Sequence, residues 1–295
     1  MVREVISILA PRNGDRVLDC TFGGGGHARA LLDSAECYVL GTDCDPDAIN
    51  RAASLKEQYN GRFDFMQCRF SELRDRLSDH GKFDAAMFDF GISSFQVDDA
   101  ARGFSFMRDG PLDMRMSKSG SSAFDVVNSF TEEDLAEMIR SYGDEPRARA
   151  GKIASSIVST RKAGGIRTTG ELREAVHKAV GNTVIRKRYS HLDPATKTFQ
   201  AIRIFVNDEL REISKALESI LHLLNGNTRI ATIAFHALED RVVKNWAASM
   251  KHCLSAVNKG VVKPSADEVM KNPRARSAKL RGFMYHSNDQ GGCTN

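Results

Sequence analysis

A strand that turns into a helix through four consecutive glycines constrains this chain more than any other feature. Residues 17–18 are apolar and predict a short buried strand, residues 23–26 are all glycine, and residues 28–32 have helical character. Such a turn can bring bare backbone N–H groups against a ligand. The next apolar strand ends at Asp43, 20 residues after Gly23. That is the spacing at which a dinucleotide-type βαβ unit places the acid that binds a ribose hydroxyl pair.

The details of the glycine run favour one nucleoside ligand over another. The run does not follow the pattern G-x-G-x-x-G, which disfavours a nicotinamide dinucleotide. An acid before the glycines, Asp19, and an acid at the tip of the second strand, Asp43, suit S-adenosylmethionine (SAM) better. SAM has a ribose but no pyrophosphate to seat on a helix N-terminus. The structural alternative is a tight strand-to-helix turn that binds nothing.

The first hundred residues predict a parallel α/β fold. A helical pattern follows Asp43, and apolar strands are expected at residues 63–66 and 83–88. Alternating strands and helices are typical of a parallel sheet, and ligands of such sheets lie beyond the carboxyl ends of the strands. We therefore expect four strand-end residues to share one rim: Asp19, Asp43, Phe70 and Asp89.

The α/β pattern breaks after Asp89 and later resumes. Residues 95–120 are rich in glycine, methionine and charge, and three helical segments follow them. Apolar residues then step by three or four from Phe199 to Leu224, which predicts one long amphipathic helix ended by Asn225-Gly226. A fifth strand and a further helix follow. The predicted domains are 1–99 with 196–295 for the α/β part, and 100–195 for an inserted helical part.

Composition is that of a globular protein without a membrane segment. The chain has 295 residues, of which 41% are hydrophobic and 27% charged, and it shows neither a bilayer-spanning apolar run nor a signal peptide. Its six cysteines form no C-x-x-C pair, which favours reduced thiols in a cytoplasmic protein over zinc or disulfides. The net charge of +4 permits a polyanionic partner without requiring one.

The motifs, taken together, resemble those of the bacterial 16S rRNA (cytosine-N4)-methyltransferases, known as RsmH or MraW. The resemblance covers nearly the whole chain in the family's order, and the run 103–116 is very specific. The segments that carry it are residues 21–27, 43–46, 89–94, 96–98, 102–116, 194–203, 235–241 and 272–277.

The resemblance implies a fold, a reaction and a partner. The fold is a Rossmann-like SAM-binding methyltransferase domain with an inserted helical domain for substrate recognition. The reaction is methylation of the exocyclic N4 of a cytidine in the decoding (P-site) region of 16S rRNA in the small ribosomal subunit. The sulfonium of SAM supplies the leaving group, so no metal is required, and the sequence leaves a monomer and a homodimer both open. Carried across by motif, the SAM contacts fall on Gly25, Gly26, His27, Asp43, Phe70, Asp89 and Gln96.

The chain departs from the family pattern at several positions. Family members usually begin with a further segment that contains a His-x-Pro-Val-Leu-like stretch, whereas Met1 here comes just before Glu4. Alanines replace the serines that usually flank His236, and Ser117 stands where an acid is usual. Leu192-Asp193 precedes Pro194 where a histidine is common. Hydroxyl or imidazole contacts at these positions are therefore not carried across.

Asp89 is the predicted catalytic acid. DNA amino-methyltransferases often place an Asp/Asn-Pro-Pro-aromatic motif after the fourth strand, and Asp89-Phe90-Gly91 occupies that place without the prolines. In the alternative, Asp89 only holds the methionine end of SAM. For His27 a cofactor contact is favoured over a role as base.

Basic residues are candidates for phosphate contacts, with a solvated surface as the alternative for each. For the basic tail, residues 259–281, a third option is an edge strand whose arginines pair with acids. Outside this tail the candidates are Arg102, Arg108, Arg115, Arg186, Lys187 and Arg188. Two other classes of protein stay open: a nicotinamide-dependent oxidoreductase, and a non-catalytic RNA-binding scaffold that keeps the fold.

Overall fold

The computed structural model describes residues 1–181 and 193–287. The chain divides into two compact units. The first consists of Met1–Gly91 and Leu210–Asn295, and the second is Ile92–Glu209. The predicted inserted segment, 100–195, lies inside the second unit.

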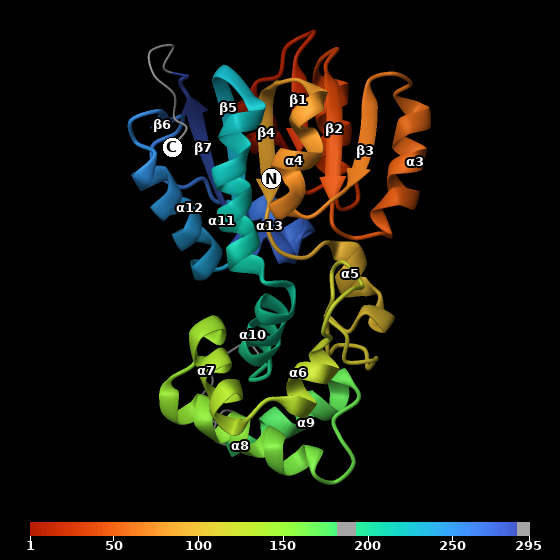
Figure 1. The fold of residues 1–295 in the computed structure, drawn as a ribbon, viewed down its shortest axis with the longest axis vertical. Coiled ribbons are helices and arrows are strands. Elements are labelled where there is room, and N and C mark those ends of the chain that lie inside the picture. The colour runs from red at the N-terminus through yellow and green to blue at the C-terminus, as the bar shows by residue number, and fades with distance from the viewer. Residues whose placement is uncertain (182–192, 288–295) are drawn as a thin grey trace. The chain divides into compact units, whose positions relative to one another are not determined.

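The first unit is built on a seven-stranded sheet in the order β3-β2-β1-β4-β5-β7-β6 (Figure 1). The five strands from β3 to β5 are parallel, and β7 runs antiparallel to both β5 and β6. The chain moves outward from β1 to β3 and then returns to the other side of β1, which creates a topological switch point between β1 and β4. The strands are β1 (Arg16–Asp19), β2 (Tyr38–Asp43), β3 (Phe63–Gln67), β4 (Phe83–Asp89), β5 (Leu224–Ala234), β6 (Leu254–Ala256) and β7 (Lys279–Tyr285).

Helices cover both faces of this sheet because neighbouring strand residues point to opposite sides. In β1, Val17 packs into one apolar cluster with α1, α2 and α3, whereas Leu18 packs into the other with α4, α11 and α12. The predicted α/β class with a mostly parallel sheet is thereby confirmed. The helices of this unit are α1 (Val2–Leu9), α2 (Gly26–Ser34), α3 (Ala48–Gln58), η1 (Phe70–Glu72), α4 (Leu73–Leu77), η2 (Ser78–His80), α11 (Glu209–Ile220), η5 (Leu221–Leu223), α12 (Ala237–Ser249), α13 (Ala266–Lys271) and η6 (Pro273–Ser277).

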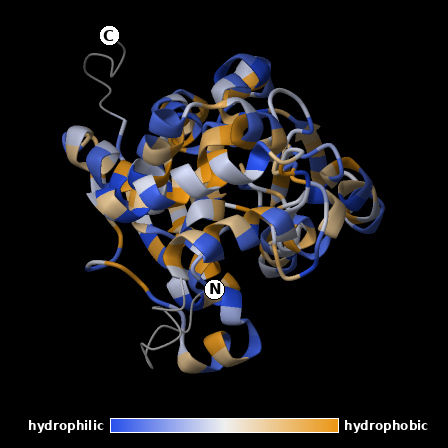
Figure 2. Ribbon diagram, turned by 90° about the horizontal axis from the view of Figure 1, so that it is seen from below, coloured by the Kyte–Doolittle hydropathy of each residue, from blue (hydrophilic) through white to orange (hydrophobic). Residues whose placement is uncertain are grey.

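The second unit is helical and has an apolar core of its own. Leu135, Ile153 and Leu172, from three successive helices, are fully buried in it. Orange and blue residues alternate along the helices in Figure 2, as expected for amphipathic helices. The helices are α5 (Ser94–Asp98), η3 (Ala100–Arg102), α6 (Ala123–Ser129), α7 (Glu132–Gly143), α8 (Arg147–Arg161), α9 (Thr169–Val180) and α10 (Thr196–Asn207).

The single long helix predicted from Phe199 to Leu224 is wrong. It is divided at Asp208, whose backbone is left-handed (φ 51°), a conformation that Asp and Asn tolerate better than most residues. The apolar period continues across the break because α10 and α11 each bury a face, but in different cores. Phe199 belongs to the core of the second unit and Leu217 to that of the first. The predicted stop at Asn225-Gly226 is also wrong, since both residues lie in β5.

Segments of the chain between α5 and α6 pack closely against one another. We therefore predict opposite effects on stability when alanine replaces Gly110, in this region, and Gly151, in α8. A Cβ on Gly110 would lie 2.0 Å from the carbonyl oxygen of Ala100, whereas no described atom lies within 4 Å of a Cβ on Gly151, inside α8. We expect Gly110→Ala to lower the free energy of unfolding by about 2–3 kcal/mol through steric overlap. Gly151→Ala should raise it by about 0.5–1 kcal/mol, because alanine favours the helix. Chemical denaturation of the full chain measures both, and equal effects would contradict this loop geometry.

Candidate active site

The glycine loop leaves the end of β1 at the topological switch point. Gly23 and Gly25 have positive φ angles of 53° and 76°, and a Cβ on Gly25 would lie 2.8 Å from the ring of Phe22. Only glycine fits such a position without movement. No described atom lies within 4 Å of a Cβ on Gly26, the first residue of α2. The loop therefore presents open space at the first turn of α2, where backbone N–H groups lack partners within the helix.

Side-chain hydrogen bonds of Asp43 and Thr21 fix this loop to the neighbouring strands. The Asp43 carboxylate accepts the backbone N–H of Gly23 at 2.8 Å and that of Asp45 at 2.9 Å. The Thr21 hydroxyl accepts the backbone N–H of Asp89 at 2.7 Å. The ends of β1, β2 and β4 are thus tied together through the loop.

His27 and Asp89 form the central pair of the rim. His27 Nε2 lies 3.4 Å from Asp89 Oδ2. Burial lowers the pKa of His27, but the hydrogen bond to Asp89 and the negative charges of Asp89 and Asp19 outweigh it, so the pKa is raised. A histidine held in this way is biased toward its protonated form and is a poor proton acceptor, which argues against the role of base.

Asp19 is the third acid of the rim and is completely buried. Its Oδ1 accepts the backbone N–H of Thr21 at 3.1 Å. Burial raises the pKa of Asp19 to about 6, the neighbouring His27 acts in the opposite direction, and the charges of Asp89 and Asp43 raise it further. Asp19 therefore lies within electrostatic range of Asp43 and Asp89, two of the residues predicted to converge with it at the strand ends.

Three polar atoms of this cluster are buried and lack a hydrogen-bond partner among the described residues: Asp19 Oδ2, His27 Nδ1 and Asp89 Oδ1. Buried polar groups are nearly always paired in folded proteins. Two of the three are carboxylate oxygens, which suit ligands that bring positive charge and hydrogen-bond donors. In SAM the ammonium group donates hydrogen bonds, and the sulfonium, which has no N–H or O–H, adds positive charge only.

Phe70 and Gln96, two further predicted contacts, lie in different units. The Phe70 ring, at the start of η1, packs edge-on against Phe88 and Phe90, with ring centroids 5.9 and 6.1 Å apart. Gln96 belongs to the second unit, where it is buried and forms a capping box with Ser93 at the start of α5.

Several predicted phosphate contacts prove to be structural. Arg102 is buried and donates to the carbonyl oxygens of Arg115 and Met116 at 2.9 and 2.8 Å, and Arg115 itself forms an ion pair with Asp113 at 2.6 Å. The guanidinium groups of these two arginines bind other parts of the chain. We therefore assign both arginines a structural role rather than a phosphate contact. Arg186, Lys187 and Arg188 lie outside the described residues.

The basic tail divides between two of the predicted alternatives. Arg281 and Lys279 lie in β7, inside the sheet, and contact the Asp240 carboxylate at 2.8 and 3.5 Å. The expected pairing with an acid is therefore correct for this part, but the expected edge strand is wrong, because β7 lies between β5 and β6. Arg274 and Arg276 lie in η6 and are exposed.

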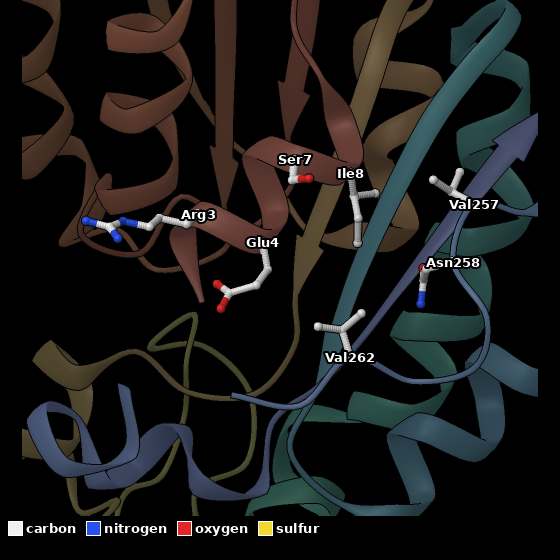
Figure 3. Close-up of a pocket in the computed structure, with 7 residues that line it drawn as sticks. All are labelled: Arg3, Glu4, Ser7, Ile8, Val257, Asn258 and Val262. Carbon is white, nitrogen blue, oxygen red and sulfur yellow. The ribbon is translucent and has the colours of Figure 1, made fainter. Parts of the chain in front are cut away.

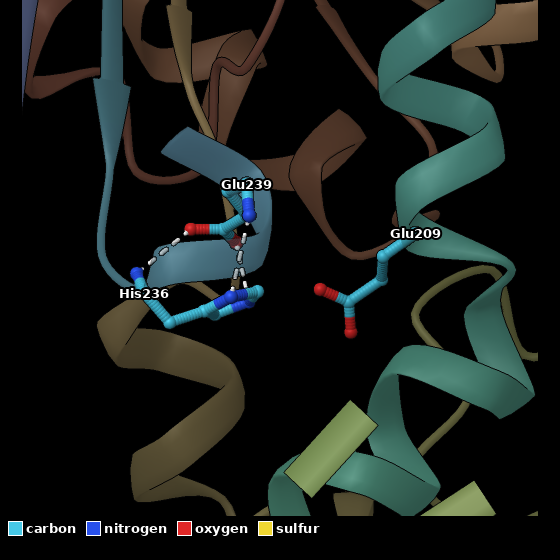
Figure 4. Close-up of side chains that lie close together, drawn as sticks. All are labelled: Glu209, His236 and Glu239. Atoms are coloured by element: carbon cyan, nitrogen blue, oxygen red, sulfur yellow. Dashed lines mark hydrogen bonds and ion pairs between the residues drawn. The ribbon is translucent and has the colours of Figure 1, made fainter. Parts of the chain in front are cut away.

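A pair that the sequence did not reveal caps α12 (Figure 4). The buried Glu239 carboxylate accepts the backbone N–H groups of Phe235 at 2.7 Å and His236 at 3.2 Å, and His236 Nε2 lies 3.1 Å from Glu239 Oε1. His236 followed three residues later by Glu239 has the spacing of a capping box, with histidine as an unusual N-cap. Glu239 is thus paired with His236, and its neighbour Asp240 is paired with Arg281.

A surface pocket lies elsewhere on the first unit (Figure 3). It is lined by Arg3, Glu4, Ser7 and Ile8 of α1 and by Val257, Asn258 and Val262. None of the strand-end acids is among these lining residues. In the described part of the chain, no helix has the length and apolar character needed to cross a membrane.

A parallel α/β sheet with acids and a glycine loop at its switch point is typical of nucleoside-dependent enzymes, and sequence comparison assigns the family. Residues 1–285 match the model of the MraW methylase family, and the chain belongs to this family. It is 43% identical to the ribosomal RNA small subunit methyltransferase H of Rickettsia canadensis over 300 residues, which covers 95% of each chain. The enzyme of the same name from Rickettsia bellii is also 43% identical, over 95% of this chain and 96% of that one.

Solved structures give more distant matches. A methyltransferase from Streptococcus mutans in complex with SAH is 11% identical, with a TM-score of 0.48 and coverage of 96% of this chain and 97% of that one. An rRNA methylase from Streptococcus thermophilus is 10% identical, with a TM-score of 0.45 and coverage of 97% and 94%. The assignment rests on the sequence family, which confirms the predicted resemblance, the methyltransferase class and SAM as the cofactor. Membership of this family excludes the nicotinamide-dependent oxidoreductase that the sequence had left open.

The raised pKa of Asp19 predicts how its replacement changes stability. A carboxyl whose pKa is about 6 in the folded chain and near 3.9 in the unfolded chain destabilises the fold as the pH rises through that window. Asp19→Asn keeps an oxygen for the Thr21 N–H and carries no charge. We expect the unbound variant to gain stability over wild type between pH 4 and 6, by up to about 3 kcal/mol at neutral pH. Urea unfolding at several pH values measures this difference, and a pH-independent one would contradict the electrostatic origin.

Proposed function

We propose that this protein transfers a methyl group from SAM to the N4 atom of a cytidine in the decoding region of 16S rRNA. The observation that carries the proposal is the cluster of acids and unpaired acceptors at the switch point, in a chain of the MraW methylase family. The relatives' name, ribosomal RNA small subunit methyltransferase, supports the substrate class. The choice of cytosine N4 rests on the family resemblance and on the chemistry below.

We assign different residues of the rim to different parts of the cofactor. Asp43 is assigned to the ribose hydroxyls, because each carboxylate oxygen that accepts a loop N–H keeps a second lone pair. Gly26 leaves room for close approach of the ligand to the backbone, and Gly25 supplies the positive φ angle that the loop requires. Phe70 offers a ring fixed by two aromatic neighbours. When bound, SAM supplies an activated methyl group on a positively charged sulfur.

Asp89 is assigned to the amino group of the target base. The N4 lone pair of cytosine is delocalised into the ring, so an acceptor for its N–H hydrogens helps the nitrogen to pyramidalise and attack. Asp89 Oδ1 is buried and unpaired among the described residues, while Oδ2 faces His27. His27 is therefore a positioning residue, which holds one oxygen of Asp89 and leaves the other for the base.

We assign the second unit to substrate recognition. Gln96 belongs to this unit and is close in sequence to the boundary with the first unit. A base that reacts at its amino group has to leave its stack, or be unstacked already. The helical unit adds the surface that such a substrate requires beyond the cofactor domain. The predicted phosphate contacts that are exposed remain candidates: Arg108, Lys259, Lys263, Lys271, Arg274 and Arg276.

The ribose assignment of Asp43 can be separated from its role in the loop. We expect Asp43→Ala to weaken binding of S-adenosylhomocysteine by about 1.5–3 kcal/mol, the value of a hydrogen bond to a charged group. The same variant should bind the 2′,3′-dideoxy analogue nearly as well as wild type does. Calorimetry with both ligands measures the difference. Equal losses for both would show that the substitution acts only by releasing Gly23.

The assignment of Asp89 predicts a larger effect on rate than on cofactor affinity. We expect Asp89→Asn to lower the rate of methyl transfer about 10²-fold, because the amide cannot act as an anionic acceptor. SAM affinity should fall less than about tenfold. Single-turnover transfer to a 16S rRNA fragment, with nucleoside mass spectrometry to identify the modified base, measures both the rate and the position. Proportional losses would reduce Asp89 to a cofactor contact, and a wild-type enzyme that binds RNA without transfer would favour the scaffold alternative.

A further inference from the structure

The segment 103–110 of the second unit is held at both ends and exposes one apolar side chain. Among the exposed large hydrophobic side chains of the described residues, Met107 is the most exposed, at 83%. Such a side chain in water contributes nothing to the core. Scattered exposed apolar residues need no explanation, but this one is presented by an unusually constrained loop.

The start of the segment is fixed by close backbone packing. Gly103 has a φ of 69°, and a Cβ there would lie 2.2 Å from the carbonyl oxygen of Pro111. The preceding Arg102 donates to two backbone carbonyls of residues 115–116. Phe104 is buried in the core of this unit.

The end of the segment is fixed as firmly. Asp109 accepts the backbone N–H of Gly170 at 2.7 Å and the hydroxyl of Thr169 at 3.2 Å, at the start of α9. Gly110 packs against the backbone of Ala100. Because both ends are fixed, the loop cannot fold over to bury Met107 without breaking these contacts.

The immediate neighbours of Met107 are also anchored. The Phe106 ring packs edge-on against Phe199, with centroids 4.9 Å apart, and the Arg173 guanidinium lies 5.6 Å from the Phe106 ring centre. The Arg108 side chain donates to the carbonyl oxygen of Asp98. Met107 is thus the projecting point of a rigid turn, with an exposed cation beside it.

We propose that Met107 is an apolar wedge that enters the base stack of the RNA substrate next to the target nucleotide. Proteins that distort nucleic acids often insert Met, Leu, Ile or Phe between base steps, and an unbranched thioether adapts well to a base face. Arg108 also donates to a backbone carbonyl, but unlike the buried Arg102 it is exposed, so its positive charge suits an adjacent phosphate. The inference rests on the proposed function, because a base taken out of its stack leaves a gap that such a side chain fills.

The test compares Met107→Ala with Met270→Ala, a matched control in α13 whose side chain is 73% exposed. The substrate is a 16S rRNA fragment with 2-aminopurine beside the target cytidine, free and within a reconstituted small subunit. Fluorescence reports unstacking whether or not methyl transfer follows. We expect wild type and Met270→Ala to raise the fluorescence on binding. Met107→Ala should lose most of that rise and about five- to a hundredfold of kcat/KM, the scale of one base-stacking contact, while Met107→Leu should restore both.

Three further readouts separate the wedge from other roles. Met107→Ala should leave the melting temperature, SAM affinity and salt dependence of RNA binding unchanged, whereas Arg108→Ala should lower the salt slope by about one. Wild-type unstacking by Met107→Ala would overturn the proposal, even if the enzyme methylates as proposed. A defect confined to the assembled subunit would overturn it in favour of a ribosomal-protein contact. Unstacking that depends on Met107 without methylation would instead contradict the proposed function.

Discussion

The hydrogen bond from the Gly23 N–H to the Asp43 carboxylate is the contact on which the candidate site depends. It holds the glycine loop against the end of β2, at the positive φ angles that only glycine adopts readily. Thr21, in the same loop, accepts the backbone N–H of Asp89 at the end of β4. The loop thereby sets the spacing of three strand ends as well as forming one wall of the site. Asp43, at the end of β2, thus has a structural role in the loop in addition to its proposed role in binding a ligand.

The electrostatics of the rim follow from this arrangement. Asp19, Asp43 and Asp89 are brought together beside a single histidine, and burial raises the pKa of the first two. Collecting carboxylates in a poorly solvated place is unfavourable unless a cation joins them. The rim is therefore better suited to a positively charged ligand than to the empty state. Loss of the sulfonium charge after methyl transfer would weaken that attraction and favour release of the product.

Sequence patterns predicted the sheet well because each of its first four strands is short, apolar and followed by a polar residue at the rim. The sequence patterns gave a wrong prediction where one apolar period runs through two separate helices, α10 and α11. Phe199 and Leu217 continue one helical period although they face different cores, and only the left-handed backbone at Asp208 separates them. The partners of Asp240 were equally hidden, since Arg281 reaches it from a distant strand.

Charge is a poor guide to function in the segment after α5, and the reason is geometric. Its loops approach so closely that a Cβ at Gly103 or Gly110 would overlap a backbone carbonyl oxygen. Other carbonyl groups of the segment, at residues 115 and 116, need donors as well. The Arg102 side chain supplies these donors and is therefore directed at the chain. Some of the basic residues in this segment are thus bound to its own backbone and stabilise its conformation. Only the side chains that remain exposed are available to a partner. If the second unit recognises the RNA as we propose, recognition would depend on a rigid surface of mixed apolar and basic character more than on the number of positive charges.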